Sequence, residues 1–419
     1  MRRAKTTAVL AGCVLLVGAT CVRAQDWPQW RGPNRDNKVI GFTEPKTWPK
    51  ELTKKWSVKV GLGDASPVMV GDKIFVFTRE GKEEVVRCLD AATGAEKWKD
   101  KYETDAVTGP GASHPGPRGS PAAADGKVCT FGVAGVLSCY DADKGKLLWR
   151  KETKAHPQFF ASASPIIVDG TCIAYIGGRG KGDVVAYDLA NGDEKWKWSG
   201  DGPAYGSPVL FTVDKTKQIV TPTEKEVVGI DAADGKLLWK AAYQAQYNSA
   251  TPVADGPMII CSGPPDRRGG AGGTTAFKIE KKDNGFDAKE AWTQPKTFAG
   301  IYNTPVLKDG LLYGLAPAGA GRGMGQPPTN IFCMKADSGD VLWTDPTKRG
   351  QCGEIFDAGS VLLALTSDKE LLAFKPSDKK YEEVAKYKVA DSETWAYPII
   401  AGNRVFVKDK DSLTLWLIE

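Results

Sequence analysis

An eleven-residue segment that recurs along the chain is the feature that most restricts its fold. Five copies align without gaps, and each runs from an apolar stretch through a turn to a tryptophan. The Asp at the third position can hydrogen-bond to its own turn, and the Gly at the seventh supplies a positive φ. The Trp offers a flat surface that can fill the gap between two stacked sheets. The motif residues are Asp90, Gly94 and Trp98; Asp141, Gly145 and Trp149; Asp188, Gly192 and Trp196; Asp231, Gly235 and Trp239; and Gly339 and Trp343, where Lys335 replaces the Asp.

Each repeat also begins in the same way. A Ser, Thr or Tyr followed by Pro precedes a short apolar run, and a turn with Asp-Gly or Gly-Asp usually comes next. Proline fits the first residue of a strand, where no hydrogen bond of the sheet is lost. The pattern therefore predicts four strands per repeat, joined by hairpin turns. These starting residues are Ser66, Ser120, Ser164, Ser207, Thr251, Thr304 and Tyr397.

The number of repeats and the two chain ends predict a closed ring. The aromatic residue of the fourth strand occurs eight times, but the first copy has no strands before it. The last unit, residues 397–418, has three strands and lacks the fourth. Residues 52–60 would supply that strand, and closure removes an exposed sheet edge. We therefore predict an all-β, eight-bladed propeller of four-stranded antiparallel blades over residues 52–419. The eight aromatic residues are Trp56, Trp98, Trp149, Trp196, Trp239, Trp292, Trp343 and Tyr387.

The N-terminus has the pattern of an export signal. Residues 1–5 are basic, and the apolar run at 8–22 is too short to span a bilayer comfortably. We predict a signal peptide over 1–24 and an exported protein of the periplasm or cell envelope. Lipidation of Cys13, which follows Leu-Ala-Gly, is the alternative and would anchor the chain to a membrane. No later stretch predicts a transmembrane helix. Residues 25–51 are predicted to form an irregular strap across the propeller or to dock a partner.

Charge and cysteine content exclude several classes of function. Without the four basic residues of the leader, the chain has 52 basic and 51 acidic residues. It therefore lacks the overall positive charge that is typical of nucleic-acid-binding proteins. Seven cysteines remain, and no Cys-x-x-Cys pattern indicates zinc or covalent haem. Cys129 and Cys139 flank one turn and are expected to lie opposite each other across a hairpin. They would be two buried thiols or a disulfide.

The repeat resembles the tryptophan-docking signature of the β-propellers of the pyrroloquinoline quinone (PQQ) type. Residues 88–98 match that signature at every position except Cys88, which replaces an Ala, and residues 26–37 resemble the lead-in of PQQ-like repeat proteins. The resemblance covers nearly the whole mature chain. It implies the eight-bladed fold, which serves quinoprotein dehydrogenases, the outer-membrane assembly factor BamB and other envelope proteins. It does not imply one function, because a fold can carry many.

Departures from the quinoprotein enzymes favour a non-catalytic function. Those enzymes carry adjacent cysteines against the quinone and a calcium held by carboxylate and amide oxygens, and neither is identifiable here. An intact repeat framework without a recognisable catalytic set therefore favours a binding or assembly scaffold in the envelope, with a protein or glycan partner and neither a cofactor nor a metal. One alternative is a divergent oxidoreductase that uses PQQ with calcium. Another is a carbohydrate- or peptide-binding propeller.

The connections between blades hold the candidate binding residues. In a propeller they surround the mouth of the central channel, where converging aromatic and polar groups can form a ligand site. The alternative is that these residues pack blade seams and cap loops. The candidates are His114, Arg118, His156, Tyr205, Tyr247, Asn248, Tyr302, Asn303 and Trp395.

Glycine-rich turns between the second and third strands carry a second group of candidates. Their basic residues could form a rim for an anionic ligand such as a carboxylate or an acidic glycan, or they could be mobile, solvated loops. The sequence lacks the strand–loop–helix context of a phosphate-binding loop and any Ser-His-Asp motif. The candidate rim residues are Arg179, Lys181, Arg267, Arg268 and Arg322.

Overall fold

The computed structural model describes residues 26–153, 155–265, 272–283, 285–295, 302–319 and 327–419. The predicted signal peptide, the Cys13 lipidation site and the rim candidates Arg267, Arg268 and Arg322 lie outside these residues. In the described part of the chain, no helix is long and apolar enough to cross a membrane.

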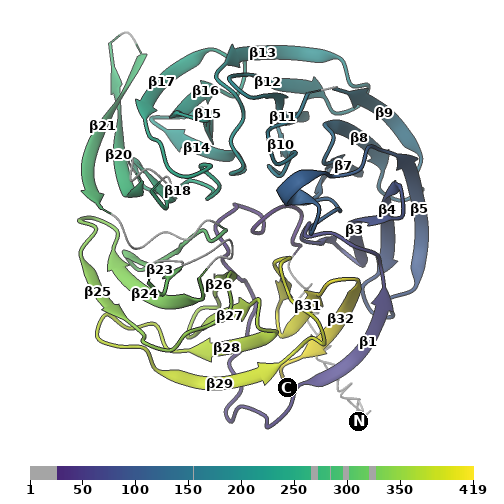
Figure 1. Cartoon of the computed structure of the whole chain (residues 1–419), viewed down its shortest axis with the longest axis vertical. Coiled ribbons are helices and arrows are strands. Elements are labelled where there is room, and N and C mark those ends of the chain that lie inside the picture. Colours follow the sequence, from purple (N-terminus) through teal and green to yellow (C-terminus); the bar gives the residue numbers. More distant parts are fainter. Residues whose placement is uncertain (1–25, 154, 266–271, 284, 296–301, 320–326) are drawn as a thin grey trace, which may run out of the picture.

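The chain forms eight four-stranded antiparallel sheets arranged in a ring, so the predicted propeller is confirmed (Figure 1). In seven of the sheets the strand order follows the chain, with the first strand nearest the channel, and the eighth sheet combines strands from both chain ends. Blade 1 is β2–β5 (Val68–Val70, Lys73–Glu80, Glu83–Asp90, Glu96–Glu103), followed by the 3-10 turn η1 (Gly109–Gly111). Blade 2 is β6–β9 (Ala122–Ala124, Lys127–Phe131, Val136–Asp141, Leu147–Glu152). Blade 3 is β10–β13 (Ile166–Val168, Thr171–Gly178, Lys181–Asp188, Glu194–Gly200). Blade 4 is β14–β17 (Val209–Val213, Thr216–Pro222, Glu226–Asp231, Leu237–Ala242).

The second half of the ring repeats this arrangement. Blade 5 is β18–β21 (Val253–Asp255, Met258–Gly263, Gly273–Lys282, Gly285–Gln294). Blade 6 is β22–β25 (Val306–Lys308, Leu311–Pro317, Thr329–Lys335, Val341–Thr344). Blade 7 is β26–β29 (Gly353–Asp357, Leu362–Thr366, Glu370–Phe374, Glu383–Lys388).

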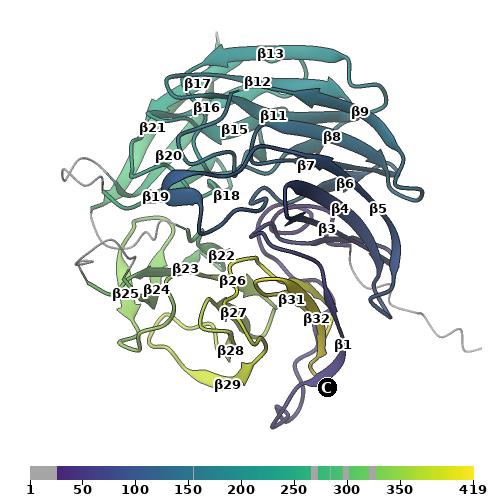
Figure 2. The same cartoon turned by 45° about the vertical axis from the view of Figure 1, so that its right-hand side comes forward.

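Blade 8 joins the two ends of the chain, as predicted. It consists of β30 (Ile399–Ala401), β31 (Arg404–Lys408), β32 (Ser412–Leu417) and the N-terminal strand β1 (Thr53–Lys59). β1 pairs antiparallel with β32 from Thr53 opposite Leu417 to Lys59 opposite Ser412. Figure 2 shows β1 along the outer side of β32. The ring therefore has no free edge at its seam.

The repeated motif connects neighbouring blades. The Trp98 indole N–H donates to the Ala142 carbonyl of blade 2 at 3.1 Å, and the ring covers Gly145. Gly145 has a φ of +67°, and the Asp141 carboxylate accepts hydrogen bonds from two amides of the same turn. The contact between a Trp and the Gly of the next blade recurs for the pairs Trp56–Gly94, Trp149–Gly192, Trp196–Gly235 and Trp292–Gly339.

Trp239 departs from this arrangement. Its indole N–H donates to the Gln218 side chain of its own blade at 2.6 Å. The next blade lacks the Asp and Gly of the motif between β20 and β21, so it has no matching turn for this ring.

The Ser-Pro and Thr-Pro residues connect the blades around the channel. Each Ser or Thr hydroxyl oxygen accepts the backbone N–H of the corresponding residue in the preceding blade, at 2.8–3.2 Å in six seams. At the start of blade 7, Cys352 and Gly353 replace the Ser and Pro, and the Asn303 side chain accepts the Gly353 N–H at 3.0 Å.

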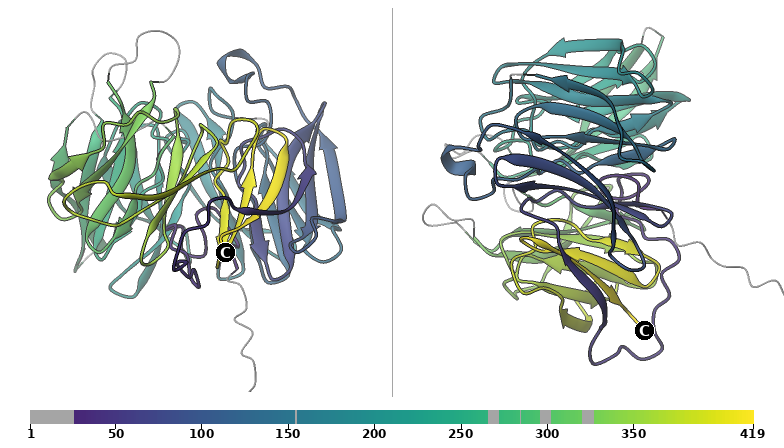
Figure 3. Two further views of the ribbon diagram at one scale, coloured as in Figure 1. Left: turned by 90° about the horizontal axis from the view of Figure 1, so that it is seen from below. Right: turned by 90° about the vertical axis from the view of Figure 1, so that its right-hand side faces the viewer.

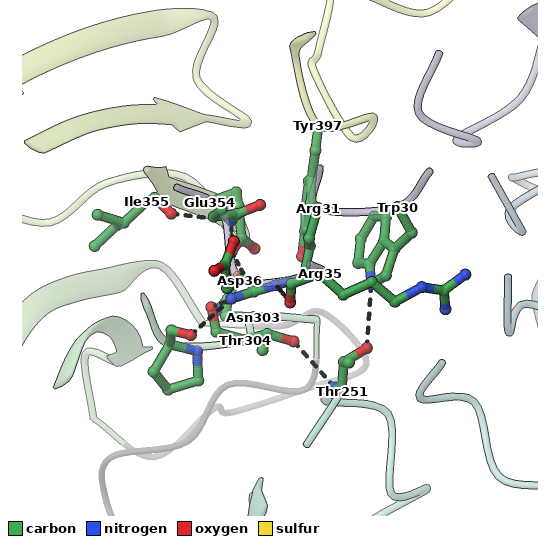
Figure 4. A network of polar contacts seen from close by, with 12 residues as sticks. Trp30, Arg31, Arg35, Asp36, Thr251, Asn303, Thr304, Glu354, Ile355 and Tyr397 are labelled. Carbon is green, nitrogen blue, oxygen red and sulfur yellow. Dashed lines mark hydrogen bonds and ion pairs between the residues drawn. The ribbon is translucent and has the colours of Figure 1, made fainter. Parts of the chain in front are cut away.

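The strap fills the axis of the ring. Its backbone pairs with Met69 of blade 1 and Ala123 of blade 2. Arg35 donates to carbonyls of blades 3 and 4, and Trp30 to Thr251 of blade 5. Arg31 reaches blades 6 and 7, and Trp30 stacks on Tyr397 of blade 8 (Figure 4). This segment of the strap therefore contacts all eight blades.

Candidate functional site

A cavity of about 710 Å³ opens at the channel mouth, on the side of the connections between blades. The strap lies toward the opposite side of the ring (Figure 3). Trp30 and Tyr397, stacked at 4.3 Å with an interplanar angle of 24°, line the cavity. Four seam residues line it as well, namely Ser164, Ser207, Thr251 and Thr304. Because the strap crosses the axis here, the cavity is a blind pocket. We call it the mouth pocket.

Six of the nine predicted mouth residues line the mouth pocket, and they come from five blade connections. Tyr302 is 46% exposed, whereas Trp395 and Arg118 are half-buried. The connections bring these residues together because each one passes over the inner end of its blade. The six are His114, Arg118, Tyr205, Tyr247, Tyr302 and Trp395.

The other three predicted residues lie outside the pocket and stabilise loops and seams. His156 stacks on Phe160 at 4.2 Å. The buried Asn248 side chain accepts the Ala245 N–H at 2.7 Å and donates to two carbonyls. Asn303 joins blades 6 and 7 through Gly353. For these residues the alternative interpretation, seam packing and loop capping, describes the observed contacts.

The charged groups among the described pocket residues are Asp64, which is paired with His114, and Arg118, which has no carboxylate partner. His114 Nδ1 lies 2.8 Å from an Asp64 carboxylate oxygen, and this hydrogen bond raises the pKa of His114. The Arg118 guanidinium donates to the carbonyls of Phe159, Gly111 and His114. Burial lowers the pKa of Arg118. Within the described chain, no carboxylate lies within ion-pair distance of it.

Aromatic rings form much of the wall. Phe159 contacts Tyr247 edge to face at 5.0 Å, and Tyr205 contacts Tyr247 in the same way at 6.1 Å. Trp395 is in edge contact with Tyr302 at 5.8 Å. Such pairs hold each other in fixed orientations.

The rim candidates that the structure describes do not reach the pocket. Arg179 and Lys181 are exposed around the turn between β11 and β12. In that turn the Gly180 N–H donates to the Glu224 carboxylate at 3.1 Å, which places an acidic group beside them.

The described pocket residues do not fit a calcium-assisted quinone site. Asp64 is the one carboxylate among the described lining residues, and it is held by His114. No group of three or more His, Cys, Asp or Glu in the described chain is arranged to hold a metal ion. Cys352 lines the pocket as a single thiol, and burial raises its pKa.

The sequence reasoning missed several pocket residues. Asp64, Gln158, Gln246 and Gln351 lie in connections without a recognisable pattern. The sequence predicts Trp30 only as part of the strap and Tyr397 only as the start of a strand. The Tyr-Pro in place of Ser-Pro is the one signal in the sequence that could have indicated Tyr397, which stacks on Trp30.

The predicted cysteine pair lies on neighbouring strands. Cys129 of β7 is directly opposite Cys139 of β8. Both are buried free thiols, and Cys172 of the next blade packs in the same cluster.

The fold and the docking motif define an eight-bladed β-propeller with PQQ-like repeats, whose channel is blocked by its own N-terminal strap. The model of the family described as outer membrane protein assembly factor BamB matches residues 45–199 and 82–345. The chain therefore belongs to this family.

The relatives that the chain matches include both an outer-membrane assembly factor and a quinoprotein dehydrogenase. BamB of Yersinia pestis is 24% identical over 214 residues, which cover 49% of this chain and 50% of that protein. A quinohemoprotein alcohol dehydrogenase of Comamonas testosteroni is 30% identical over 247 residues, which cover 56% of this chain and 34% of that protein. The chain thus matches about half, or less, of the length of these relatives.

Solved structures show the same fold. BamB from Moraxella catarrhalis has a TM-score of 0.61 at 15% identity, covering 88% of this chain and 98% of that one. The Comamonas testosteroni quinohemoprotein alcohol dehydrogenase has a TM-score of 0.66 at 16% identity, covering 96% and 81%. At these identities the likeness concerns the fold alone.

Proposed function

We propose that this chain is a non-catalytic binding or assembly scaffold of the cell envelope, similar in role to BamB. Its membership of the BamB family supports a function with protein partners. The signal-peptide pattern at 1–24 supports export. The partner would be an envelope protein or glycan that approaches the mouth face, because the strap covers the axis toward the other face.

The observation that supports this proposal is the lining of the mouth pocket, in which no described residue forms a hydrogen-bonded pair of nucleophile and base. Covalent catalysis needs a nucleophile hydrogen-bonded to a base that a third group orients. Asp64 does orient His114, but no serine hydroxyl in the described chain is hydrogen-bonded to that imidazole. Among its described lining residues the pocket thus has binding groups, namely aromatic rings, amides and a guanidinium group, and no activated nucleophile.

Site-specific photo-crosslinking in intact cells tests the scaffold function. A photoreactive residue at Arg179 samples the mouth face, and one at Asp143, in a turn between the third and fourth strands of blade 2, samples the opposite face. We expect one discrete crosslinked envelope partner from position 179, competed by excess unlabelled protein, and none from position 143. Equal labelling from both faces, or none from either, would contradict the proposal.

A PQQ-dependent oxidoreductase is the second candidate, favoured by the relative from Comamonas testosteroni. Titrating the mature protein with PQQ, with and without calcium, separates the two candidates through tryptophan fluorescence and calorimetry. We expect no saturable binding at high micromolar PQQ. One-to-one binding strengthened by calcium, followed by dye reduction with an alcohol or a sugar, would replace the scaffold function with the enzymatic one.

A further inference from the structure

We infer that the mouth pocket binds a sugar acid. The carboxylate of the ligand contacts Arg118 and the hydroxyl groups of the pocket floor, which are those of Ser164, Ser207 and Thr304. The hydroxyl groups of the ligand contact the side chains of Gln158, Gln246 and Gln351. This goes beyond the proposed function, because a ligand can occupy the pocket whether or not a partner docks on the mouth face.

The first step is the unbalanced charge of Arg118. Its guanidinium is half-buried and donates to three backbone carbonyls, at 3.3 Å for Gly111 and 3.0 Å for His114, with Phe159 as the third. In the described chain it has no ion pair, and the nearby carboxylate of Asp64 is held by His114. A partly buried cation of this kind is stabilised by an anion that reaches it.

The second step is the donor-rich floor. The hydroxyl oxygens of Ser164, Ser207 and Thr304 each accept a backbone N–H at 2.9–3.0 Å. All three side chains are at most 5% exposed, and in the described chain none of their O–H protons has an acceptor. One lone pair of each oxygen is therefore engaged, while the O–H proton remains available to a ligand. The floor can therefore donate to an oxygen-rich, electron-rich group such as a carboxylate.

Thr251 strengthens this reading. Its Oγ1 accepts both the Ser207 N–H at 3.2 Å and the Trp30 indole N–H at 3.1 Å. With both lone pairs used, the hydroxyl can act further only as a donor.

The third step concerns the rest of the ligand. The side chains of Gln158, Gln246 and Gln351 line the pocket, and none has a hydrogen-bond partner in the described chain. A free amide both donates and accepts, so it matches a hydroxyl, which does the same. A quinone carbonyl only accepts and would leave the amide oxygens unpaired. The apolar C–H face of a sugar ring can pack on the aromatic wall.

The shape of the pocket limits how such a ligand enters. Trp30 and Tyr397 close the floor, so the pocket can take a free monosaccharide acid or the end of an acidic polysaccharide, but not the middle of a long chain. Both sources present the same carboxylate and hydroxyl groups.

Isothermal titration of the mature protein tests the inference with D-glucuronate and its neutral counterpart D-glucose. Trp30 and Trp395 line the pocket, so their fluorescence provides a second readout. We expect one-to-one binding of glucuronate, with glucose about ten- to hundredfold weaker, since a hydrogen bond to a charged group is lost. Equal affinities, no binding of either sugar, or equally tight binding of benzoate would overturn the inference.

Variants locate the carboxylate. Arg118→Gln should weaken glucuronate about ten- to hundredfold and leave glucose unchanged, whereas the matched control Arg179→Gln should change neither. If Arg118→Gln disturbs folding, Gln246→Leu tests the hydroxyl contacts and should weaken both sugars. Unchanged glucuronate affinity in a folded Arg118→Gln or Gln246→Leu protein would also overturn the inference.

A glucuronate-terminated oligosaccharide then distinguishes the two sources of the ligand. Tighter binding than that of the monomer indicates the end of a polysaccharide, and equal binding indicates a free sugar acid. Failure of these titrations would leave the crosslinking result, and so the scaffold function, unaffected.

Discussion

Arg31 and Glu354 form an ion pair inside the ring, with Nη1 2.5 Å from a carboxylate oxygen and side chains 1% and 0% exposed. Asn37 also donates to this carboxylate. Burial raises the pKa of Glu354 to about 7, although Arg31 acts in the opposite direction. The position of the strap thus depends on a buried ion pair, in which the charge of Glu354 is tolerated in the interior only because Arg31 is present.

We predict that Arg31→Met destabilises the protein by about 3–5 kcal/mol at pH 8, because it leaves Glu354 buried and unpaired. Without Arg31 the pKa of Glu354 in the folded state lies further above its unfolded value. The folded variant therefore binds the proton more tightly, and its stability falls as the pH rises above about 4.5. The loss should be smaller at pH 5 than at pH 8, as measured by urea unfolding. Arg31→Met combined with Glu354→Gln should remove most of this pH dependence, and a loss that is the same at both pH values would contradict the explanation.

At the scale of the structural element, the turn of the repeat is fixed by two separate demands on its glycine. The residue must have a positive φ, and it must leave room for the tryptophan of the preceding blade. Gly145 meets both demands, since an added Cβ would lie 2.5 Å from the Trp98 ring. Gly126, in the first turn of the same blade, has a φ of +69° but no atom within 4 Å of such a Cβ.

Comparing Gly126 with Gly145 separates the energetic cost of backbone strain from the cost of losing the tryptophan contact. Gly126→Ala should cost about 1 kcal/mol, because only the left-handed backbone conformation is penalised. Gly145→Ala should cost at least about 2 kcal/mol more, since the alanine also displaces Trp98 from the seam. Thermal and urea unfolding of the two variants measure the difference. Equal losses would show that the tryptophan contact contributes little to the seam.

At the scale of the whole molecule, stability depends on the pairing of two segments at opposite ends of the chain. β1 and β32 bury the seam, and Trp56 contacts both Phe406 of blade 8 and the Gly94 turn of blade 1. Replacing residues 52–60 by a Gly/Ser linker of the same length keeps the strap tethered but removes the strand.

We expect this replacement to expose the edge of β32 and to cause aggregation with a lowered melting temperature. Size-exclusion chromatography and calorimetry provide the measurement. As a control, the charged residues Lys54 and Lys55 of the same strand can be exchanged for Thr, which keeps the strand and should leave the protein monomeric. A monomeric linker variant with unchanged stability would contradict the role of ring closure.

The sequence was sufficient for the fold because a propeller is built from local, repeated units. Each Asp-Gly turn, each Trp and each strand-starting proline acts within one blade or between neighbours, so the pattern predicts both the blade and the number of blades. The same reasoning predicted that residues 52–60 complete blade 8. Trp239 packs against core residues of blade 5, but its indole N–H donates within its own blade, because the turn in the next blade departs from the motif.

The channel interior could not be predicted in this way. Arg31 meets Glu354, and Trp30 meets Tyr397, across more than 300 positions of the chain, and no local pattern encodes those pairings. Likewise, the predicted mouth residues share a sequence context, yet only the path of each connection decided that six line the pocket while His156, Asn248 and Asn303 do not. The sequence alone thus determined the blades and their number, since these follow from short-range periodicity. Only the tertiary structure decided how the strap closes the channel and which groups face the pocket, because those contacts arise where eight separate segments converge on one axis.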